Sequence, residues 1–432
     1  MKTTVTQEGP TKVRISVEAT PDEVAPAVDR AFERLAGEVK VPGFRKGKVP
    51  RKVLEARLGA DEIREASLQE AVPLLWRQAM TESDISPISL PDIEVQSYDD
   101  QGLSFDALFE VRPEINLPDF ATISVERPDT DVTDAEIEDQ LARLQDRFAT
   151  LETIARPSQR GDFMLIDLKG YVHDAEVPEA SATDLLYEVG TERFVPELDR
   201  ELEGKRQGDI LKFNATLPPN YPGEFAEKEI SFQVLVKENR QKNIPALDDE
   251  FAKSASEFDT LDELRADLKT RIGELKRVSA DSEVRNRLLE KVIAEASVPV
   301  PEAMTNDELS FRVARFSDQL RHAGVSVEQY LERTGQTEEQ VTDDLRTQAE
   351  RNVAAQLILD EVGKREELEA TEEDLQAELL VHAQALQKEP EELRKELVSK
   401  GRLGALAADI IRRKALDLIV ERADIKTETQ SA

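Results

Sequence analysis

Basic residues cluster in one short stretch of an otherwise acidic chain. Between Lys40 and Arg57 the sequence holds seven Lys or Arg residues and one acidic residue, Glu55, whereas the whole chain has a formal net charge of −33. Prolines and glycines in the segment 41–50 indicate a tight, exposed loop. Lys and Arg bind phosphates with release of counterions, and acidity elsewhere disfavours nonspecific coating of nucleic acid. The pattern predicts one local, salt-sensitive anion-docking site; an ordinary solvated loop is the alternative.

Other kinds of chemistry find little support in the composition. The chain has no cysteine, which excludes disulfides, thiolate nucleophiles and Cys-ligated zinc and favours a reducing compartment. Its histidines, His173, His322 and His382, are far apart and show no metal-ligand spacing. Neither a phosphate-binding loop of the Walker type nor a dinucleotide fingerprint is present. We therefore expect no metal, no cofactor and no ATP-driven cycle.

The basic loop resembles a known motif. Its run Gly-Phe-Arg-Lys-Gly-Lys-Val-Pro at residues 43–50 resembles the ribosome-docking motif of the bacterial trigger factor family, and the length and order of segments resemble that family over essentially the whole chain. The resemblance implies that Arg45 and Lys46 pair with ribosomal RNA phosphates and with acidic groups of the exit-tunnel ribosomal protein, while Phe44 is an apolar anchor. The ribosome-binding residues that it implies are Gly43, Phe44, Arg45, Lys46, Gly47, Lys48 and Arg51.

A second resemblance concerns residues 195–208, which are similar to the segment around the central helix of FK506-binding-type prolyl isomerases. Such enzymes need no nucleophile, because a dry apolar bowl favours the twisted imide over the more polar planar forms. The family's aromatic positions are aliphatic here at Leu168, Val177 and Leu185, which indicates weak activity. The alternative is that these residues only fill the core of a small β domain. The bowl that the resemblance implies consists of Val195, Leu198, Tyr221 and Phe232, with Phe194 beside them.

The order of patterns along the 432 residues predicts an α+β multidomain protein. Alternation at Val13, Ile15 and Val17 predicts a strand, and a capping box at Thr20 begins a helix. Residues 1–112 form the predicted ribosome-binding domain, with two further strands at 93–98 and 103–111, and residues 113–154 are an extended linker and helix. Residues 155–243 are predicted to form an isomerase-like antiparallel β domain with a central helix and strands at 163–172, 185–189, 210–217 and 230–236. Residues 244–432 are predicted to form an elongated all-helical domain.

Two apolar patterns concern helix packing. The spacing of Ile137, Leu141, Leu144, Phe148 and Leu151 indicates a helix that needs a partner; packing within the molecule is favoured over self-association because the pattern lasts barely two heptads. Beyond Pro245 everything is predicted to be helical, with aliphatic stripes and few aromatic residues, which suits extended arms with accessible apolar surface. Core packing is the default role of any single leucine there. The residues proposed for client binding are Phe311, Phe316, Leu320, Leu403, Leu406 and Ile410.

The resemblance implies an ATP-independent chaperone that docks on the large ribosomal subunit at the polypeptide exit, holds nascent polypeptides open and assists folding and export, with peptidyl-prolyl isomerase activity. Holding clients is a binding function with weak, replaceable contacts. The alternatives are a ribosome-bound holdase with a weak or inactive isomerase domain, a free prolyl isomerase, and a structural or stress factor without clients. The N-terminus lacks a secretory signal and no stretch reaches membrane-spanning length, so we expect a cytoplasmic protein without membrane contact. A homodimer away from the ribosome stays open.

Overall fold

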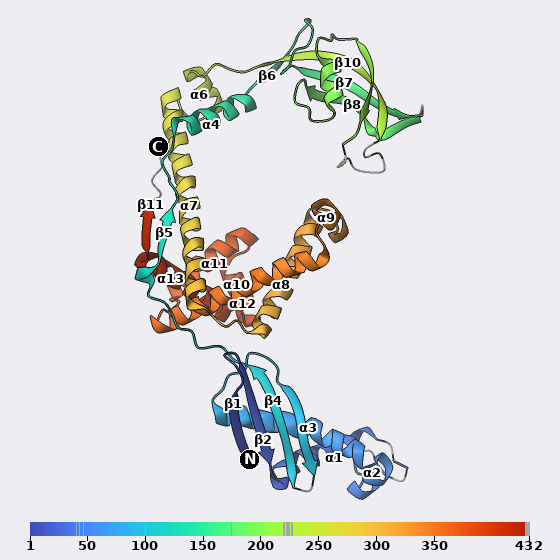
Figure 1. The fold of residues 1–432 in the computed structure, drawn as a ribbon, viewed down its shortest axis with the longest axis vertical. Coiled ribbons are helices and arrows are strands. Elements are labelled where there is room, and N and C mark those ends of the chain that lie inside the picture. The colour runs from blue at the N-terminus through green and yellow to red at the C-terminus, as the bar shows by residue number, and fades with distance from the viewer. Residues whose placement is uncertain are drawn as a thin grey trace. The chain divides into compact units, whose positions relative to one another are not determined.

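The computed structural model describes residues 1–427 apart from 40, 43, 46, 100, 174, 219–220, 222–224 and 226–227. Residue contacts divide the chain into two compact units, of which one contains Met1–Pro128 together with Asp281–Ala432 and the other contains Asp129–Ala280. This division is coarser than the four predicted segments, whose boundaries stay a prediction. Mixed sheets and helices followed by a long helical region confirm the predicted fold class (Figure 1).

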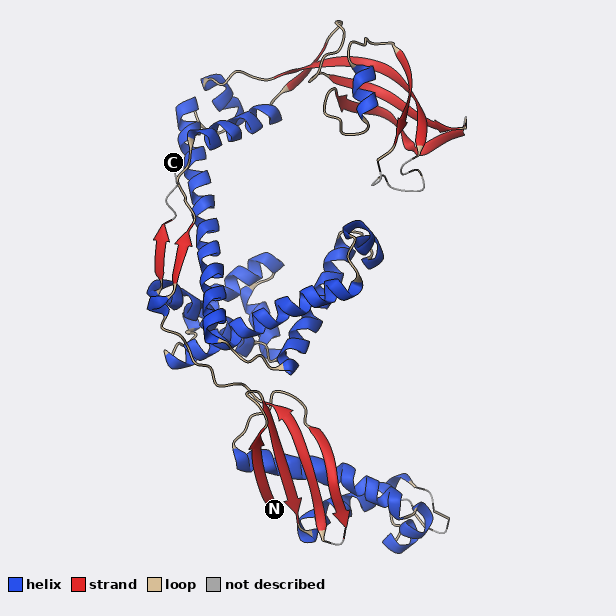
Figure 2. Cartoon of the chain, viewed as in Figure 1, coloured by secondary structure: helices blue, strands red, loops and turns tan. Residues whose placement is uncertain are grey.

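The first unit begins with a four-stranded antiparallel sheet in the order β1-β2-β4-β3. Helices α1 and α3 contact the strands of this sheet, and α2 packs on both helices at one end (Figure 2). The strand expected around Val13, Ile15 and Val17 is confirmed, and these three side chains are buried in the core under the helices. The elements are β1 (Lys2–Gln7), β2 (Lys12–Ala19), α1 (Pro21–Glu38), α2 (Arg51–Leu58), α3 (Ala60–Ser83), β3 (Asp92–Asp99) and β4 (Gly102–Glu110).

Helix α1 starts where the sequence predicts. The carboxylate of Glu23 accepts hydrogen bonds from the backbone N–H and the hydroxyl of Thr20, each over 2.9 Å, and Pro21 occupies the first turn. These bonds satisfy groups that a helix N-terminus would otherwise leave unpaired. Strand β1 was not predicted, because five of its six residues are polar and give little apolar signal.

The helical part of the first unit surrounds a core of aliphatic side chains from α7, α10 and α13. Short segments near residue 120 complete this core through Phe120, Ile123 and Val125. The elements are η1 (Phe120–Thr122), β5 (Ser124–Arg127), the second half of α7 (Leu261–Ala296), α8 (Glu302–His322), α9 (Val327–Thr334), α10 (Glu338–Arg365), α11 (Glu372–Leu386), α12 (Pro390–Ser399), α13 (Leu403–Arg422) and β11 (Asp424–Thr427).

The expectation that everything beyond Pro245 is helical is wrong at the end of the described chain. Residues Asp424–Thr427 form strand β11, which pairs in parallel with Ser124–Arg127. Lys291 donates from Nζ to the carbonyl oxygen of Ser124 over 2.6 Å, which adds a side-chain hydrogen bond to β5. A four-residue strand whose partner lies 300 positions earlier leaves no local signal in a sequence.

The second unit contains a strongly bent antiparallel sheet in the order β6-β10-β7-β8, with β9 paired to β10. Helix α5 packs on this sheet, as the resemblance to the isomerase fold predicts. Strand β8 is longer than the predicted segment 185–189, and β6 was not predicted. The elements are β6 (Thr150–Thr153), β7 (Phe163–Val172), β8 (Ala175–Glu188), α5 (Pro196–Leu202), β9 (Ile210–Thr216) and β10 (Glu229–Asn243).

A separate small helical core belongs to the second unit. Helix α4 (Asp134–Arg147) packs with α6 (Asp249–Ala255) and with the first half of α7. Ile137 and Leu141 are buried in this contact, so the predicted apolar stripe finds its partner within the same chain. The stripe ends earlier than expected, because the helix stops at Arg147 and Leu151 lies in strand β6.

Candidate functional site

The basic loop connects α1 to α2 and is held by backbone hydrogen bonds. The N–H of Gly47 donates to the carbonyl of Ala36 on α1 over 2.8 Å, and the N–H of Lys48 donates to the carbonyl of Arg45 over 2.9 Å. Gly47 adopts φ +81°, a conformation that glycine reaches without the steric cost that a Cβ imposes. Gly43 and Lys46, which the sequence motif also includes, lie outside the described residues.

A small hydrophobic core lies beneath the loop. Val41 at one end of the loop and Val49 at the other are buried, and they belong to a cluster with Phe32, Leu54 and Ile63 from α1, α2 and α3. Burial of both ends fixes where the loop leaves and rejoins the helices. The exposed residues between them are therefore carried on a packed base.

Three side chains of the loop face solvent. Phe44 is 44% exposed, which is unusual for a large aromatic residue, and Arg45 and Lys48 are exposed as well. Within the described part of the chain, the side chains of Arg45 and Lys48 form no ion pair and no hydrogen bond. An exposed apolar ring in the same short loop as two uncompensated cations can bind an anionic, partly apolar surface, so the exposure of these residues agrees with the docking chemistry that the sequence predicts.

Arg51 differs from the other loop cations. Its guanidinium forms an ion pair with Asp29 on α1 and lies 4.8 Å from the centre of the Phe32 ring. Both contacts are made within the molecule, so they compensate the positive charge and tie the start of α2 to α1. Arg51 is therefore placed to position the loop.

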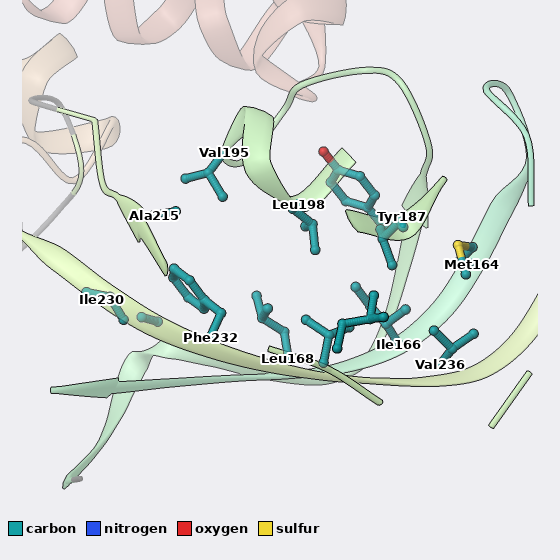
Figure 3. Packing of buried hydrophobic residues seen from close by; sticks show 14 of the residues in the cluster. Met164, Ile166, Leu168, Tyr187, Val195, Leu198, Ala215, Ile230, Phe232 and Val236 are labelled. Atoms are coloured by element: carbon teal, nitrogen blue, oxygen red, sulfur yellow. The ribbon is translucent and has the colours of Figure 1, made fainter. Parts of the chain in front are cut away.

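The expected isomerase bowl is mostly closed in the second unit. Val195, Leu198 and Phe232 are each at most 1% exposed, and Figure 3 shows them among the residues that pack between α5 and the sheet. Of the four predicted residues only Tyr221 is partly exposed, and its hydroxyl donates to the carbonyl of Glu179 over 2.6 Å. A proline ring could reach Val195, Leu198 or Phe232 only if neighbouring side chains moved.

Aromatic rings do gather beside this core. The Phe194 ring meets the Phe232 ring edge-on, with 5.5 Å between centroids, and meets the Tyr221 ring at 6.2 Å. Phe213, which sequence reasoning missed, stacks on Phe232 at 5.5 Å. Phe213 lies on β9 opposite Phe232 on β10. This pairing could have identified Phe213, but it is known only once the register of the two strands is known. Phe194, Phe213 and Tyr221 are only partly buried, so they form the accessible aromatic face of this domain.

A buried polar network fixes the start of α5. Tyr187 donates its hydroxyl to the Asp199 carboxylate over 2.6 Å, and the backbone N–H groups of Gly190 and Glu192 donate to the same carboxylate. Burial and the neighbouring Asp199 raise the pKa of Tyr187 to about 12. The Tyr187 hydroxyl and both N–H groups have an acceptor in this buried network, so it stabilises the fold.

The helical part carries exposed apolar side chains on α8 and α9. Phe311 is 62% exposed, and the Phe316 ring meets the Tyr330 ring edge-on with 5.1 Å between centroids. These three residues line a cavity of about 670 Å³ between α8, α9 and α10. Large apolar side chains around an open cavity are typical of a binding surface.

The other predicted client residues differ in accessibility. Leu320, Leu403 and Leu406 are half-buried, whereas Ile410 is only 1% exposed and lies inside the helical part. A side chain without exposed surface cannot contact a client, so Ile410 is removed from the proposed surface. The structure adds exposed apolar residues of α11 and α12 that the sequence analysis did not single out, namely Leu380, Val381, Leu386 and Val398.

Neither metal binding nor membrane spanning finds support in the described residues. No group of three or more His, Asp or Glu side chains is close enough there to hold a metal ion. Nor does any helix in the described ranges combine the length and apolar character needed to cross a membrane.

Comparison with known proteins gives a consistent result over the length of the chain. A family model described as bacterial trigger factor protein matches residues 1–144, and one described as its C-terminus matches residues 260–421. The trigger factor of Saccharopolyspora erythraea is 37% identical over 99% of this chain and 91% of its own length. That of Rhodococcus opacus is 38% identical over 100% and 92%, and that of Nocardia farcinica is 39% identical over 98% and 91%. The chain belongs to the trigger factor family.

A solved structure supports the fold of this trigger factor family member. It was determined in a study of promiscuous substrate recognition in the folding and assembly activities of the trigger factor chaperone, and it covers 98% of this chain and 99% of its own, with a TM-score of 0.60 and 24% identity. The chain is accordingly a ribosome-associated molecular chaperone. The trigger factor family also carries a peptidyl-prolyl isomerase domain.

Proposed function

We propose that the chain docks on the large ribosomal subunit through Phe44, Arg45 and Lys48, together with Gly43, Lys46 and Gly47 of the same motif. The cations would bind ribosomal RNA phosphates and acidic groups of the exit-tunnel ribosomal protein, and the ring of Phe44 would fill an apolar recess. The observation that carries this proposal is the exposed ring of Phe44 in the same short loop as two exposed cations that lack a partner among the described residues. Work at the polypeptide exit would place the protein in the cytoplasm.

Sedimentation with purified large ribosomal subunits tests this docking. We expect the double variant Phe44→Ala/Arg45→Ala to lose sedimentation at low salt while its circular dichroism stays unchanged. The matched control is Leu90→Ala/Arg77→Ala, which removes an exposed apolar and an exposed basic side chain elsewhere in the same domain. Equal sedimentation of the docking variant and the control would reject the assignment.

The exposed apolar residues would hold nascent polypeptides. Phe311, Phe316 and the half-buried Leu320, Leu403 and Leu406 give many weak contacts, and a chaperone without ATP needs clients that leave by simple dissociation. The exposed apolar residues of α11 and α12 extend this surface. Suppression of the aggregation of a chemically denatured protein by the full chain tests client holding. A structural factor without clients would give no suppression.

Prolyl isomerisation would be weak. The face formed by Phe194, Phe213 and Tyr221 is partly exposed, and it is more open than the dry bowl that stabilises a twisted imide. We expect the full chain to accelerate isomerisation of a proline peptide modestly, and Tyr221→Ala to reduce kcat/KM. If the wild-type chain gives only the uncatalysed rate, the domain is not an enzyme. Self-association away from the ribosome stays a prediction, which sedimentation equilibrium would test.

A further inference from the structure

A continuous groove runs along helix α10. The cavity of about 670 Å³ beside Phe311 adjoins a second cavity of about 480 Å³ between α7, α8 and α10, since Arg312, Gln348 and Asn352 line both. We call the two together the α8–α10 groove. Its lining combines an aromatic end with a long polar section.

Three amide side chains form a row on the α10 wall of this groove. Gln348, Asn352 and Gln356 are four residues apart, so they lie on one face of the helix and succeed one another by roughly 6 Å along its axis. An extended polypeptide repeats its main-chain groups on one side every two residues, or roughly 6.6 Å. The spacing of the amide side chains and the spacing of the main-chain groups are similar. The three flexible side chains can therefore each contact one main-chain group of an extended polypeptide.

The row keeps hydrogen-bonding capacity free. The Gln348 Oε1 accepts from Arg312 over 3.1 Å, which leaves its amide N–H groups available, and the Asn352 Nδ2 donates to Glu308 over 2.8 Å, which leaves its oxygen available. The side chain of Gln356 has no hydrogen bond to any other described residue. Free donors and acceptors in one row are complementary to the N–H and C=O groups of a main chain.

The charges in the groove compensate one another. Glu283 pairs with Arg287 over 2.8 Å, Glu308 pairs with Arg312 over 2.9 Å, and Glu290 forms an ion pair with Arg351. The lining as a whole contains four arginines and four carboxylates, in a chain whose formal net charge is −33. A neutral lining gives no advantage to a polyanion or to a strongly basic segment, and it favours an uncharged main chain.

We propose that the α8–α10 groove binds an extended, unfolded polypeptide segment by its main chain, through Gln348, Asn352 and Gln356. The aromatic end formed by Phe311, Phe316 and Tyr330 takes one large apolar side chain of that segment. Main-chain recognition explains how one surface accepts clients of different sequence, and solvated amides exchange with water, so release needs no ATP. This inference rests on the client-holding function proposed above and adds the chemistry that is recognised.

Ester substitution in a client peptide tests main-chain recognition. The probe is a fluorescent, uncharged ten-residue peptide with one phenylalanine, compared with a version in which every second amide is an ester, which removes donors without changing side chains. We expect the full wild-type chain to bind the ester peptide roughly 2- to 10-fold more weakly. In the variant Gln348→Leu/Gln356→Leu the ester penalty should shrink, because only the Asn352 oxygen is left in the row to accept from the main chain. The matched control Gln78→Leu/Gln140→Leu replaces exposed helical glutamines of α3 and α4 and should keep the wild-type ratio.

The outcomes separate the two proposals. Equal affinity of the wild-type chain for both peptides, or an ester penalty that is undiminished in Gln348→Leu/Gln356→Leu, overturns main-chain recognition while client holding stands. Failure to bind either peptide, together with failure to suppress aggregation, overturns client holding itself. The single variant Gln356→Leu repeats the test if the double variant does not fold, because Gln356 supports no other described side chain. A change in oligomeric state of the glutamine variant would assign the groove to a second copy of the chain and overturn the inference.

Discussion

The backbone N–H of Gly47 donates to the carbonyl of Ala36 over 2.8 Å, which joins the middle of the basic loop to the last turns of α1. The same loop has Val41 and Val49 buried at its two ends. Three points of attachment therefore hold a short segment whose exposed residues include Phe44, Arg45 and Lys48. A loop ordered in advance loses less conformational entropy when it binds.

Replacing Gly47 by alanine should weaken docking without unfolding the domain. No atom lies within 4 Å of the position that a Cβ would occupy, so the cost comes from the positive φ alone, about 1 kcal/mol. We expect ribosome affinity to fall severalfold while the melting temperature changes little. The control Gly37→Ala lies within α1, where the added methyl group also meets nothing. An unchanged affinity of Gly47→Ala would show that the loop geometry is unimportant.

Substitutions of Arg51 should affect stability more than ribosome binding. Its contacts with Asp29 and the Phe32 ring are intramolecular, and lysine keeps the charge but loses the planar guanidinium. Arg51→Lys should lower the free energy of unfolding by about 0.5–1 kcal/mol. Under conditions in which the variant is fully folded, its affinity for ribosomes should be unchanged. Chemical denaturation and a ribosome-binding titration measure the two effects. A large loss of affinity in a stable Arg51→Lys protein would make Arg51 a direct docking residue.

Local signals predicted much of this molecule. A capping box placed the start of α1, and alternation at Val13 to Val17 placed a central strand, because these patterns act over a few residues. The exposed cations of the loop were likewise visible in the sequence. What could not be predicted depends on distant partners: the burial of Ile410, the pairing of β11 with β5, and the stacking of Phe213 on Phe232. Side-chain accessibility in a helical stripe is set by its neighbours in space, which periodicity does not name.

Phe311 and Ile410 should separate client binding from stability. Phe311→Ala removes an exposed ring and should change the free energy of unfolding by less than about 0.5 kcal/mol while lowering suppression of client aggregation. Ile410→Ala empties a buried site and should cost about 2–5 kcal/mol. Light scattering of a denatured client and urea denaturation give the two readouts. Full chaperone activity in Phe311→Ala would place the client surface elsewhere.

High pH should weaken the isomerase-like domain through Tyr187. Its pKa is raised to about 12 in the folded chain, from an ordinary value of 10.0, chiefly by burial and also by Asp199. The folded state therefore favours the neutral phenol, so the associated stability is complete below pH 10 and is lost as the pH rises to about 12. Tyrosinate absorbance should show a titration step near pH 12 in the wild-type chain that is absent from Tyr187→Phe, whereas the late titration of Tyr221, whose pKa burial also raises, should remain. A wild-type chain whose tyrosines all titrate near the ordinary value would contradict the buried Tyr187–Asp199 pair.

Acidic conditions should loosen the contact between α11 and α13. A hydrogen bond from Lys414, together with bonds from Thr371, lowers the pKa of Asp374 to about 2, from an ordinary value of 3.8. The stabilising contribution is present above the ordinary value and is lost as the pH falls toward 2. Asp374→Asn should reduce the dependence of Tm on pH in this window. The control Glu373→Gln, at the exposed neighbouring residue, should not. Identical pH profiles of the two variants would refute this role of Asp374.

The most direct test of ribosome docking is an equilibrium titration of the labelled full chain with purified large ribosomal subunits over a range of salt concentrations. We predict saturable binding at low salt that weakens as salt increases, and Arg45→Gln should reduce the slope of log K against log salt by about 1. Replacing Phe44, Arg45 and Lys46 together by alanine should abolish binding, while Leu90→Ala/Arg77→Ala should bind like the wild type. Absence of binding by the intact chain at low salt, or undiminished binding by the triple variant, would contradict the account.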